Sequence, residues 1–380
     1  MSAVSLALDE DEVALRAAAR GFVAAHSPVA DVRALRDEPD SAGMRATVWR
    51  QMLDMEWPAM AVSTDRGGVG AGYYPLGVIF EELGHNLVLS PLLAVCQALT
   101  CLQNAGGERG SALLASVLAG QSLAIVAHQE SNHHAVSRVR TCVEQTSQGY
   151  SLSGEKRFAL YGAQADAYLV SARLSGEDSA PLGLFVVDAG QPGVSVKACR
   201  LMDSQPRAHL LFNEVALDRA ALLIGPDSAA TVLDEAIDVA TGLLSAEMLG
   251  SLSAALQLTV DHLKHRVQFG AVIGSFQALQ HRAARMLVAE EMTTSTVRAA
   301  LRSLDEQPRD AAETVSVAKL WANEAFSLIA REGVQMHGGL GMTDEVDIGL
   351  YLKRAQVACS QWGDSTFHRR RIAAHKLSGE

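Results

Sequence analysis

The chain has 380 residues, of which 48% are hydrophobic and 20% are charged, and its formal net charge is −11 at pH 7. This amount of apolar material can form a sizeable core, and the length favours two or three domains. The acidic balance argues against a nucleic-acid-binding surface, and no basic run or basic amphipathic helix predicts binding to an anionic membrane.

Helical spacing of apolar residues dominates the chain from about residue 8 to 122, interrupted by a glycine-rich turn at 67–72. From about residue 123 to 225 the pattern changes to short alternating or β-branched runs bounded by glycine and polar turns, which is typical of strands. Long helical patterns return from about residue 228 to the end. We therefore predict an α+β protein with a helical domain over 1–122, a β domain over 123–227 and a helical domain over 228–380.

The N-terminus carries no secretory signal pattern, because no positive region precedes an apolar stretch. The five cysteines are scattered and none forms a CxxC spacing. These features predict a reduced cytoplasmic protein with free thiols.

Glu247 is the only ionisable residue in the stretch VATGLLSAEMLGSLSAAL, residues 239–256. Burial raises the pKa of an acid, by up to ~3–5 units when it is complete, so a carboxylate in such a place can accept a proton near neutral pH. An alternative is that Glu247 pairs with an Arg or Lys, or faces solvent, since ion pairs perturb acids as readily as catalysis does. The glutamate and the many small residues disfavour a transmembrane span here.

The sequence HQESNHH groups His128, Glu130, His133 and His134, but it has neither the HExxH spacing nor a cysteine partner for zinc. We predict a loop there and no metal site. The glycines at 67–72 lack the GxGxxG spacing of a dinucleotide fold.

Two motifs follow Glu247: HRVQFGAVIGSFQALQ at 265–280 and QMHGGLG at 335–341. An arginine fork suits a pyrophosphate, and glycines let backbone N–H groups approach a phosphate closely. In this order and at this separation, the motifs resemble those of the acyl-CoA dehydrogenase family. The resemblance extends to residues 55–87 and 152–173 and so covers nearly the whole chain.

The resemblance implies a helical domain, a middle β-barrel-like domain and a C-terminal four-helix bundle. It also implies FAD as cofactor, with the two motifs binding its ADP half, usually that of a neighbouring subunit. The residues so implicated are Arg266, Phe269, Gln277, Gln335, Gly338 and Gly339.

In this family a carboxylate removes the α-proton of an acyl-CoA thioester while the β-hydrogen leaves as hydride to flavin N5, giving a trans-2-enoyl-CoA. Many members place the base in a Tyr-Glu-Gly segment near the C-terminus, where this chain reads Gln-Trp-Gly-Asp over 361–364 and has no glutamate. Other members, including some that act on steroid side chains, place it on the helix that here carries Glu247. We therefore expect Glu247 to be the base, with Asp364 as the alternative.

The chain departs from the family on the isoalloxazine side of the site. Residues 127–133 lack the family's Thr-Glu-Pro and Gly-Ser-Asp, and its Trp-x-Thr becomes Phe158-Ala159-Leu160. Phe158 can still pack against a flavin ring, whereas Leu160 offers no hydroxyl. The asymmetry raises the hypothesis of an α2β2 heterotetramer in which this chain completes the FAD site of a second acyl-CoA dehydrogenase-like chain.

The sequence leaves three functions open. The first, which we favour, is a dehydrogenase that passes electrons to an electron-transfer flavoprotein, as a homotetramer or an α2β2 heterotetramer. The second is a non-catalytic subunit, and the third is a flavin oxidase or monooxygenase on the same fold. Few large side chains surround Glu247 in the sequence, which leaves room for a bulky, steroid-like acyl group.

Overall fold

The structure is a computed structural model that describes residues 8–38, 42–135, 138–177, 179–306 and 311–378. These residues form two compact units, and each unit collects segments that lie far apart in the sequence. The first unit contains the described residues up to Ala34, then Tyr73–Val88 and the chain from Thr241 on. The second contains the described parts of Leu35–Gly72 and Leu89–Ala240.

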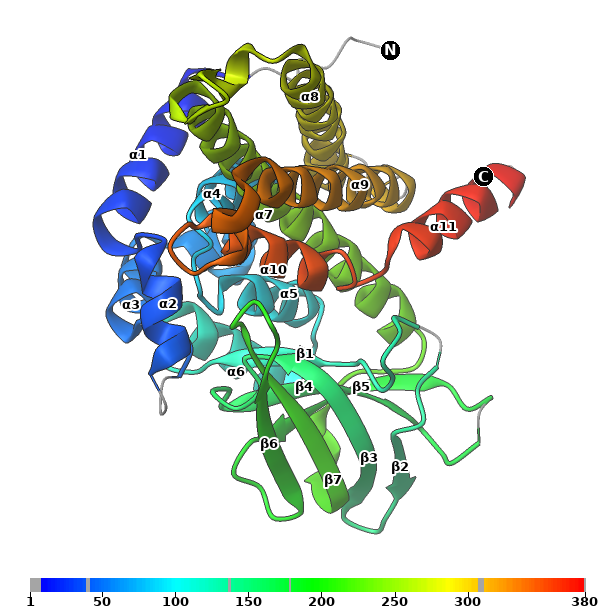
Figure 1. Ribbon diagram of the computed structural model, residues 1–380. Coiled ribbons are helices and arrows are strands. Elements are labelled where there is room, and N and C mark those ends of the chain that lie inside the picture. Colours follow the sequence, from blue (N-terminus) through cyan, green and yellow to red (C-terminus); the bar gives the residue numbers. More distant parts are fainter. Residues whose placement is uncertain (1–7, 39–41, 136–137, 178, 307–310, 379–380) are drawn as a thin grey trace. The chain divides into compact units, whose positions relative to one another are not determined.

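The first unit is mainly helical. Its elements are α1 (Glu10–His26), α4 (Tyr73–His85), most of α7 (Ala229–His265), β9 (Val267–Gln268), β10 (Ala271–Val272), η4 (Ile273–Ser275), α8 (Gln277–Glu306), α9 (Ala311–His337), η5 (Gly338–Met342), α10 (Ile348–Ala358) and α11 (Ser365–Ser378). Helices α8 and α9 pack along each other, and α9 also contacts α10 and α11 (Figure 1). Helix α2 (Ala30–Asp37) is divided between the two units.

Helix α1 shows how local sequence fixes an element of this unit. The Asp9 carboxylate accepts a hydrogen bond from the backbone N–H of Glu12 at 2.8 Å, and the Glu12 carboxylate accepts one from the backbone N–H of Asp9 at 2.8 Å. This capping box satisfies two backbone donors that the first turn of a helix otherwise leaves unpaired.

The second unit contains a sheet that has eight strands within the described residues. They are β1 (Ala124–Ala127), β2 (Cys142–Gln145), β3 (Gly149–Leu160), β4 (Ala167–Arg173), β5 (Leu182–Asp188), β6 (Val194–Arg200), β7 (Pro206–Asp218) and β8 (Leu222–Ile224). The order is β6-β7-β3-β2-β4-β5-β8, and β1 pairs with β4 in parallel. Strand β4 is buried through Ala172, so its sequence AYLVSAR is almost continuously apolar rather than alternating.

Helices also belong to the second unit. They are α3 (Ala46–Asp54), α5 (Leu92–Gln103), α6 (Gly107–Leu118) and the short turns η1 (Trp57–Ala59), η2 (Thr64–Arg66) and η3 (Arg219–Ala221). Helix α5 contacts β1, and α6 contacts β8. The predicted sequence of helices, then strands, then helices is confirmed, while the division into three domains at 122 and 227 stays a prediction.

Helix α7 is, among the described residues, the one helix long and apolar enough to cross a membrane when judged by length and composition. In the structure 94% of its most apolar window is buried inside the protein. We therefore interpret α7 as a core helix.

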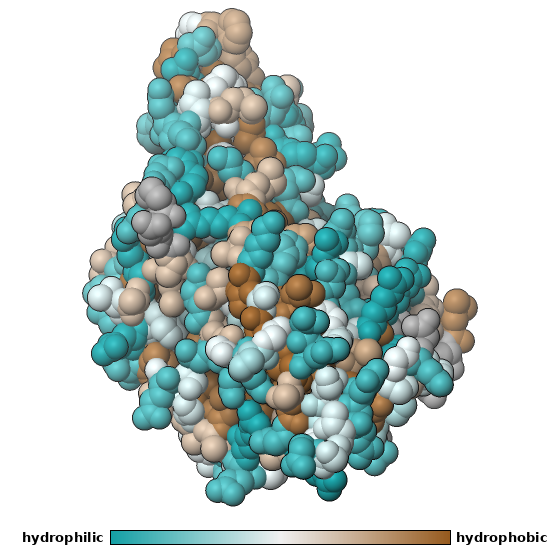
Figure 2. Space-filling model, turned by 90° about the horizontal axis from the view of Figure 1, so that it is seen from below, coloured by the Kyte–Doolittle hydropathy of each residue, from teal (hydrophilic) through white to brown (hydrophobic). Residues whose placement is uncertain are grey.

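Hydrophilic residues predominate on the face shown in Figure 2, and hydrophobic residues gather in a small group near its centre.

Candidate active site

Glu247 lies where α7 crosses α4 in backbone contact. A Cβ atom added to Gly84 of α4 would be 1.9 Å from the carbonyl oxygen of Glu247, and one added to Gly250 of α7 would be 1.7 Å from the carbonyl oxygen of Glu81. Such distances are impossible for real Cβ atoms, so each helix needs a glycine at the crossing. The Ser251 hydroxyl also donates to the Gly84 carbonyl oxygen at 2.8 Å. These contacts fix the backbone that carries the Glu247 side chain.

The carboxylate of Glu247 forms an ion pair with Arg354 of α10. Arg354 Nε donates to Glu247 Oε1 at 2.8 Å, and Arg354 Nη2 lies 2.7 Å from the same oxygen. The two side chains are only 10% and 4% exposed, respectively. The structure thus contains the arginine partner that the sequence left open, and Glu247 as catalytic base stays a prediction.

Asp364 has a different environment. It is exposed, and its carboxylate accepts a hydrogen bond from the backbone N–H of Phe367 at 2.8 Å, at the start of α11. The preceding carbonyl oxygen, of Gly363, accepts from the ammonium of Lys319 at 3.4 Å. Lys319 is fully buried, and this burial lowers its pKa to about 7. The carboxylate of Asp364 therefore serves to begin a helix, which favours Glu247 over Asp364 as the candidate base.

The first motif predicted to bind the ADP half of FAD forms an exposed hairpin between α7 and α8. Arg266 follows the last residue of α7, and Phe269 occupies the β9–β10 turn with a φ of 54° and 93% exposure. Gln277 is the first residue of α8 and is also exposed. All three side chains are thus exposed at the surface of the single chain.

The second motif lies at the end of α9. Gln335 is in its last turn, and Gly338 and Gly339 begin η5, all three being exposed. Gly338 has a φ of 62°, and a Cβ atom added at either glycine would meet nothing within 4 Å. Open glycine backbone of this kind can accommodate a phosphate group, so the residues present fit an ADP moiety.

The two motifs predicted to bind ADP are brought together by a pair of histidines. His262 of α7 stacks on His337 of α9 with ring centroids 4.3 Å apart and an angle of 28° between the rings. The backbone N–H of Arg266 donates to the carbonyl oxygen of His262 at 2.9 Å, and His337 directly precedes Gly338. The sequence analysis missed this contact.

Phe158 belongs to the second unit. It lies in an irregularity of β3, where the pairing with β7 shifts between Lys156 and Ala159, and its φ is 55°. Its ring meets that of His209 edge to face at a centroid distance of 4.9 Å. Leu160, two residues on, is buried.

The second unit also contains a buried polar cluster that the sequence analysis did not recognise. The ammonium of Lys156, which is completely buried, donates to Glu130 at 2.6 Å and to the Ser171 hydroxyl at 3.0 Å. Glu130 also accepts from the backbone N–H groups of Arg140 at 2.6 Å and Thr141 at 3.1 Å. The cluster ties the start of the 128–135 segment, which is a loop as predicted, to β3 and to the residues before β2.

Lys156 and Glu130 shift each other's titration. Burial lowers the pKa of Lys156 to about 8, although the charge of Glu130 opposes this shift. Burial acts to raise the pKa of Glu130, but the charge and hydrogen bond of Lys156, together with the hydrogen bonds from Arg140 and Thr141, outweigh it and the pKa is lowered. A lysine inside a predicted strand was the available signal, but nothing in its spacing from Glu130 indicated their contact.

Comparison with known proteins identifies the chain. The family descriptions "Acyl-CoA dehydrogenase, N-terminal domain" and "Acyl-CoA dehydrogenase, C-terminal domain" match residues 9–119 and 230–377. Acyl-CoA dehydrogenase IpdE2 of Mycobacterium tuberculosis is 30% identical to the chain over 347 residues, which cover 91% of each protein. The chain belongs to the acyl-CoA dehydrogenase family. It is thus a member of a family of FAD-dependent oxidoreductases, as its motifs predicted.

Two solved structures share the fold. The ChsE4–ChsE5 complex from Mycobacterium tuberculosis contains a chain with a TM-score of 0.87 and 28% identity, and the match covers 99% of this chain and 100% of that one. A variant of the steroid acyl-CoA dehydrogenase Tcur3481–Tcur3483 gives a TM-score of 0.86 and 27% identity, covering 97% and 98%. The predicted fold is confirmed over essentially the whole chain.

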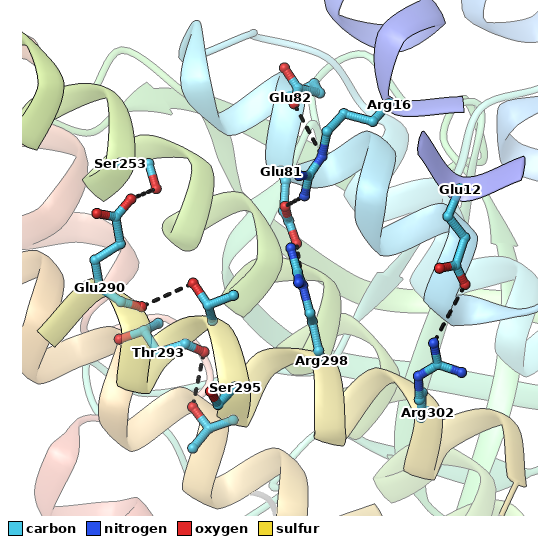
Figure 3. Close-up of polar contacts among 12 residues, drawn as sticks. Glu12, Arg16, Glu81, Glu82, Ser253, Glu290, Thr293, Ser295, Arg298 and Arg302 are labelled. Carbon is cyan, nitrogen blue, oxygen red and sulfur yellow. Dashed lines mark hydrogen bonds and ion pairs between the residues drawn. The ribbon is translucent and has the colours of Figure 1, made fainter. Parts of the chain in front are cut away.

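In this acyl-CoA dehydrogenase chain a charged network joins α1, α4 and α8 (Figure 3). Glu81 forms ion pairs with Arg16 and, at 4.0 Å, with Arg298, while Arg20 binds Glu82 at 2.9 Å. Burial raises the pKa of Glu81 against the opposing charges of Arg16 and Arg298. The network borders a groove of about 350 Å³. Two adjacent glutamates in the apolar sequence of α4 could have indicated buried carboxylates that require cationic partners.

Proposed function

We propose that this chain is an acyl-CoA dehydrogenase that desaturates a bulky, steroid-like acyl-CoA to the trans-2-enoyl-CoA, with Glu247 as the base. The observation that carries the proposal is the buried Glu247 carboxylate, held by a fixed backbone and paired with Arg354. An unpaired buried carboxylate tends to be protonated and cannot then accept a proton. Arg354 supplies the positive charge that compensates this carboxylate.

The charge balance of the reaction also agrees with this pair. When the α-proton moves to a carboxylate oxygen of Glu247, negative charge moves from the glutamate to the developing enolate of the thioester. The guanidinium of Arg354 then loses its counter-charge and favours a nearby anion. Proton transfer therefore moves a charge within the site without creating a new one.

For the cofactor, we propose that Arg266, Gln277 and the Gly338–Gly339 backbone hold the ADP half of FAD and that Phe269 packs against it. Phe158 would pack against an isoalloxazine ring. When bound, FAD supplies the acceptor for the β-hydride, and an electron-transfer flavoprotein would reoxidise it. The open backbone at both glycines and the exposed side chains of this surface support the assignment.

The steroid-like substrate and the assembly are proposed from relatives. The Tcur3481–Tcur3483 protein is a steroid acyl-CoA dehydrogenase, and both it and ChsE4–ChsE5 carry the names of two proteins. We propose a tetramer of this chain, or an α2β2 heterotetramer with a second acyl-CoA dehydrogenase-like chain, located in the cytoplasm.

A second candidate function is a non-catalytic subunit that completes the FAD site of a partner chain. One observation favours it: the buried Leu160 has no hydroxyl to offer a flavin. In that case the Glu247–Arg354 pair would only stabilise the packing of α7 on α10.

The test is the FAD absorbance per chain of protein expressed alone, followed by anaerobic bleaching with acyl-CoAs from butyryl to steroid thioesters. The proposal expects about one FAD per chain and rapid bleaching by a bulky thioester. Glu247→Gln should keep the flavin and slow bleaching by orders of magnitude, whereas Asp364→Asn should bleach at close to the normal rate. Little bound flavin, or normal bleaching by Glu247→Gln, would instead support the non-catalytic subunit or another base.

A further inference from the structure

The stacked imidazoles of His262 and His337 connect the two segments to which we assign the ADP half of FAD. His262 lies one turn before Arg266 on α7, and His337 is the last residue of α9, next to Gly338. His337 is buried, and its Nδ1 contacts the carbonyl oxygen of Gly333 at 2.8 Å. Since an imidazole can carry a proton near neutral pH, this junction contains a titratable pair within the dinucleotide-binding region.

The surroundings of His262 determine when it can carry a proton. Burial lowers its pKa, and the neighbouring His337 and Arg266 lower it further. The charged and titratable groups on the adjoining parts of α7, α9 and α8 are Asp261 paired with Lys264, His265, Arg266, His337, and Glu332 paired with Arg282. Arg266 and His337, which disfavour a proton on His262, thus belong to or directly precede the residues proposed to bind the pyrophosphate.

We propose that His262 takes up a proton when the pyrophosphate of FAD binds beside Arg266 and Gly338, so that FAD binds more tightly at mildly acidic pH. This inference rests on the proposed function, because it requires those two residues to hold the ADP half. The pyrophosphate carries negative charge, which offsets the repulsion from Arg266 and favours the imidazolium form of His262. The two ring centroids are 4.3 Å apart, so a proton on one imidazole disfavours a proton on the other. The pair therefore binds one proton more readily than two.

The direction of the pH dependence follows from the linkage between FAD binding and proton binding. If binding raises the pKa of His262, the complex holds more protons than the free protein over the pH range between the two values. The dissociation constant of FAD then falls as pH decreases across that range, by at most about tenfold for each pH unit. In the free protein the pKa of His262 is lowered from its usual value of ~6.5, and this lowered pKa is the lower end of the range. The upper end is the pKa of His262 in the complex with FAD.

The experiment is calorimetric titration of FAD into the flavin-stripped oligomer, between pH 6 and 8, in buffers with different ionisation enthalpies. This gives both the dissociation constant and the number of protons taken up. Wild type should take up a fraction of one proton per FAD and bind about threefold to tenfold more tightly at pH 6 than at pH 8. His262→Phe keeps an aromatic ring in the stack and should abolish the uptake.

The matched control is His26→Phe, which removes an exposed histidine at the end of α1, outside both motifs, and should behave as wild type. Equal proton uptake in His262→Phe and wild type, or FAD affinity that does not depend on pH in wild type, would overturn the inference and leave the ADP assignment intact. An Arg266→Met variant that binds FAD as tightly as wild type would refute the ADP assignment, and this inference with it. Thermal unfolding of each variant at pH 8 identifies any loss of fold.

Discussion

The Glu247–Arg354 pair joins residues that are 107 positions apart in the sequence, on α7 and α10. Removing one partner of a buried ion pair is costly because it leaves an uncompensated charge, whereas removing both is much less so. The two kinds of variant therefore separate the contribution of the pair to the stability of the helical unit from the cost of an unpaired charge.

We predict that Arg354→Met lowers the free energy of unfolding by about 3–5 kcal/mol, measured by urea denaturation. Glu247→Gln/Arg354→Met should recover most of this loss. Unchanged stability in Arg354→Met would show that the pair contributes little in solution.

Lys156 and Glu130 form a second buried pair, in the β-sheet unit. We predict that Lys156→Met lowers the free energy of unfolding by about 3–5 kcal/mol, because it leaves the Glu130 carboxylate without its cation. Lys156→Met/Glu130→Gln should restore part of the loss. Lys197→Met, at an exposed position on β6 of the same sheet, is the control and should change stability by less than about 0.5 kcal/mol. If both lysine variants unfold at the same urea concentration, the pair does not stabilise the unit.

At the residue level, the sequence could predict that Glu247 lies in apolar surroundings, since no other ionisable residue occurs between 239 and 256. It could not predict which arginine compensates the charge. The stack of His262 on His337 was equally inaccessible, because it depends on how the ends of α7 and α9 meet. Partners separated by many residues are selected by packing, which a periodic pattern does not encode.

At the level of elements, the α4–α7 crossing depends on two glycines that face each other's helix backbone. Gly84 and Gly250 each leave no space for a Cβ atom, whereas Gly21 in α1 has nothing within 4 Å. We predict that Gly84→Ala and Gly250→Ala each destabilise the protein by about 1–3 kcal/mol or more, because the helices must separate.

The matched control is Gly21→Ala. It should stabilise the protein by about 0.5–1 kcal/mol, because alanine is the better helix former and no contact opposes it. Urea denaturation of the three variants compares them directly. A Gly84→Ala variant as stable as Gly21→Ala would mean that α4 and α7 do not require close backbone contact at their crossing.

The succession of elements followed from sequence because its signals are local. The alternating runs between 123 and 225 predicted strands, and eight of the described strands end by Ile224. What could not be predicted is that the N-terminal helices divide between two units, α1 and α4 joining one and α3, α5 and α6 the other. That choice is made by distant contacts, such as those of Arg16 with Glu81 and of α5 with β1.

At the level of the whole molecule, the helical unit exposes several large apolar side chains. They are concentrated on the hairpin after α7, on α8 and in η5: Val267, Phe269, Val272, Phe276, Leu287, Val288, Met292 and Met342. Exposed apolar groups that gather in one region mark sites of association. If the motif at 265–280 binds the FAD of a neighbouring subunit, as the proposed function implies, cofactor binding and assembly should depend on the same surface.

Phe269 provides the test of this dependence. It is 93% exposed in the single chain, and its nearest ring, that of Phe276, is 6.5 Å away between centroids. Phe269→Ser should therefore leave the fold of the flavin-free chain intact while it weakens FAD binding at least about tenfold, the equivalent of ~1.4 kcal/mol. Flavin absorbance after gel filtration and molar mass from light scattering measure both effects.

Leu377→Ser is the control, because Leu377 is 87% exposed on α11 and lies outside both ADP motifs. It should retain the flavin content and mass of the wild type. Loss of flavin and of the tetramer together in Phe269→Ser would indicate that this turn contacts a neighbouring subunit. Loss of flavin alone would place the FAD contact within one chain, and full retention of both would contradict a role for Phe269 in either.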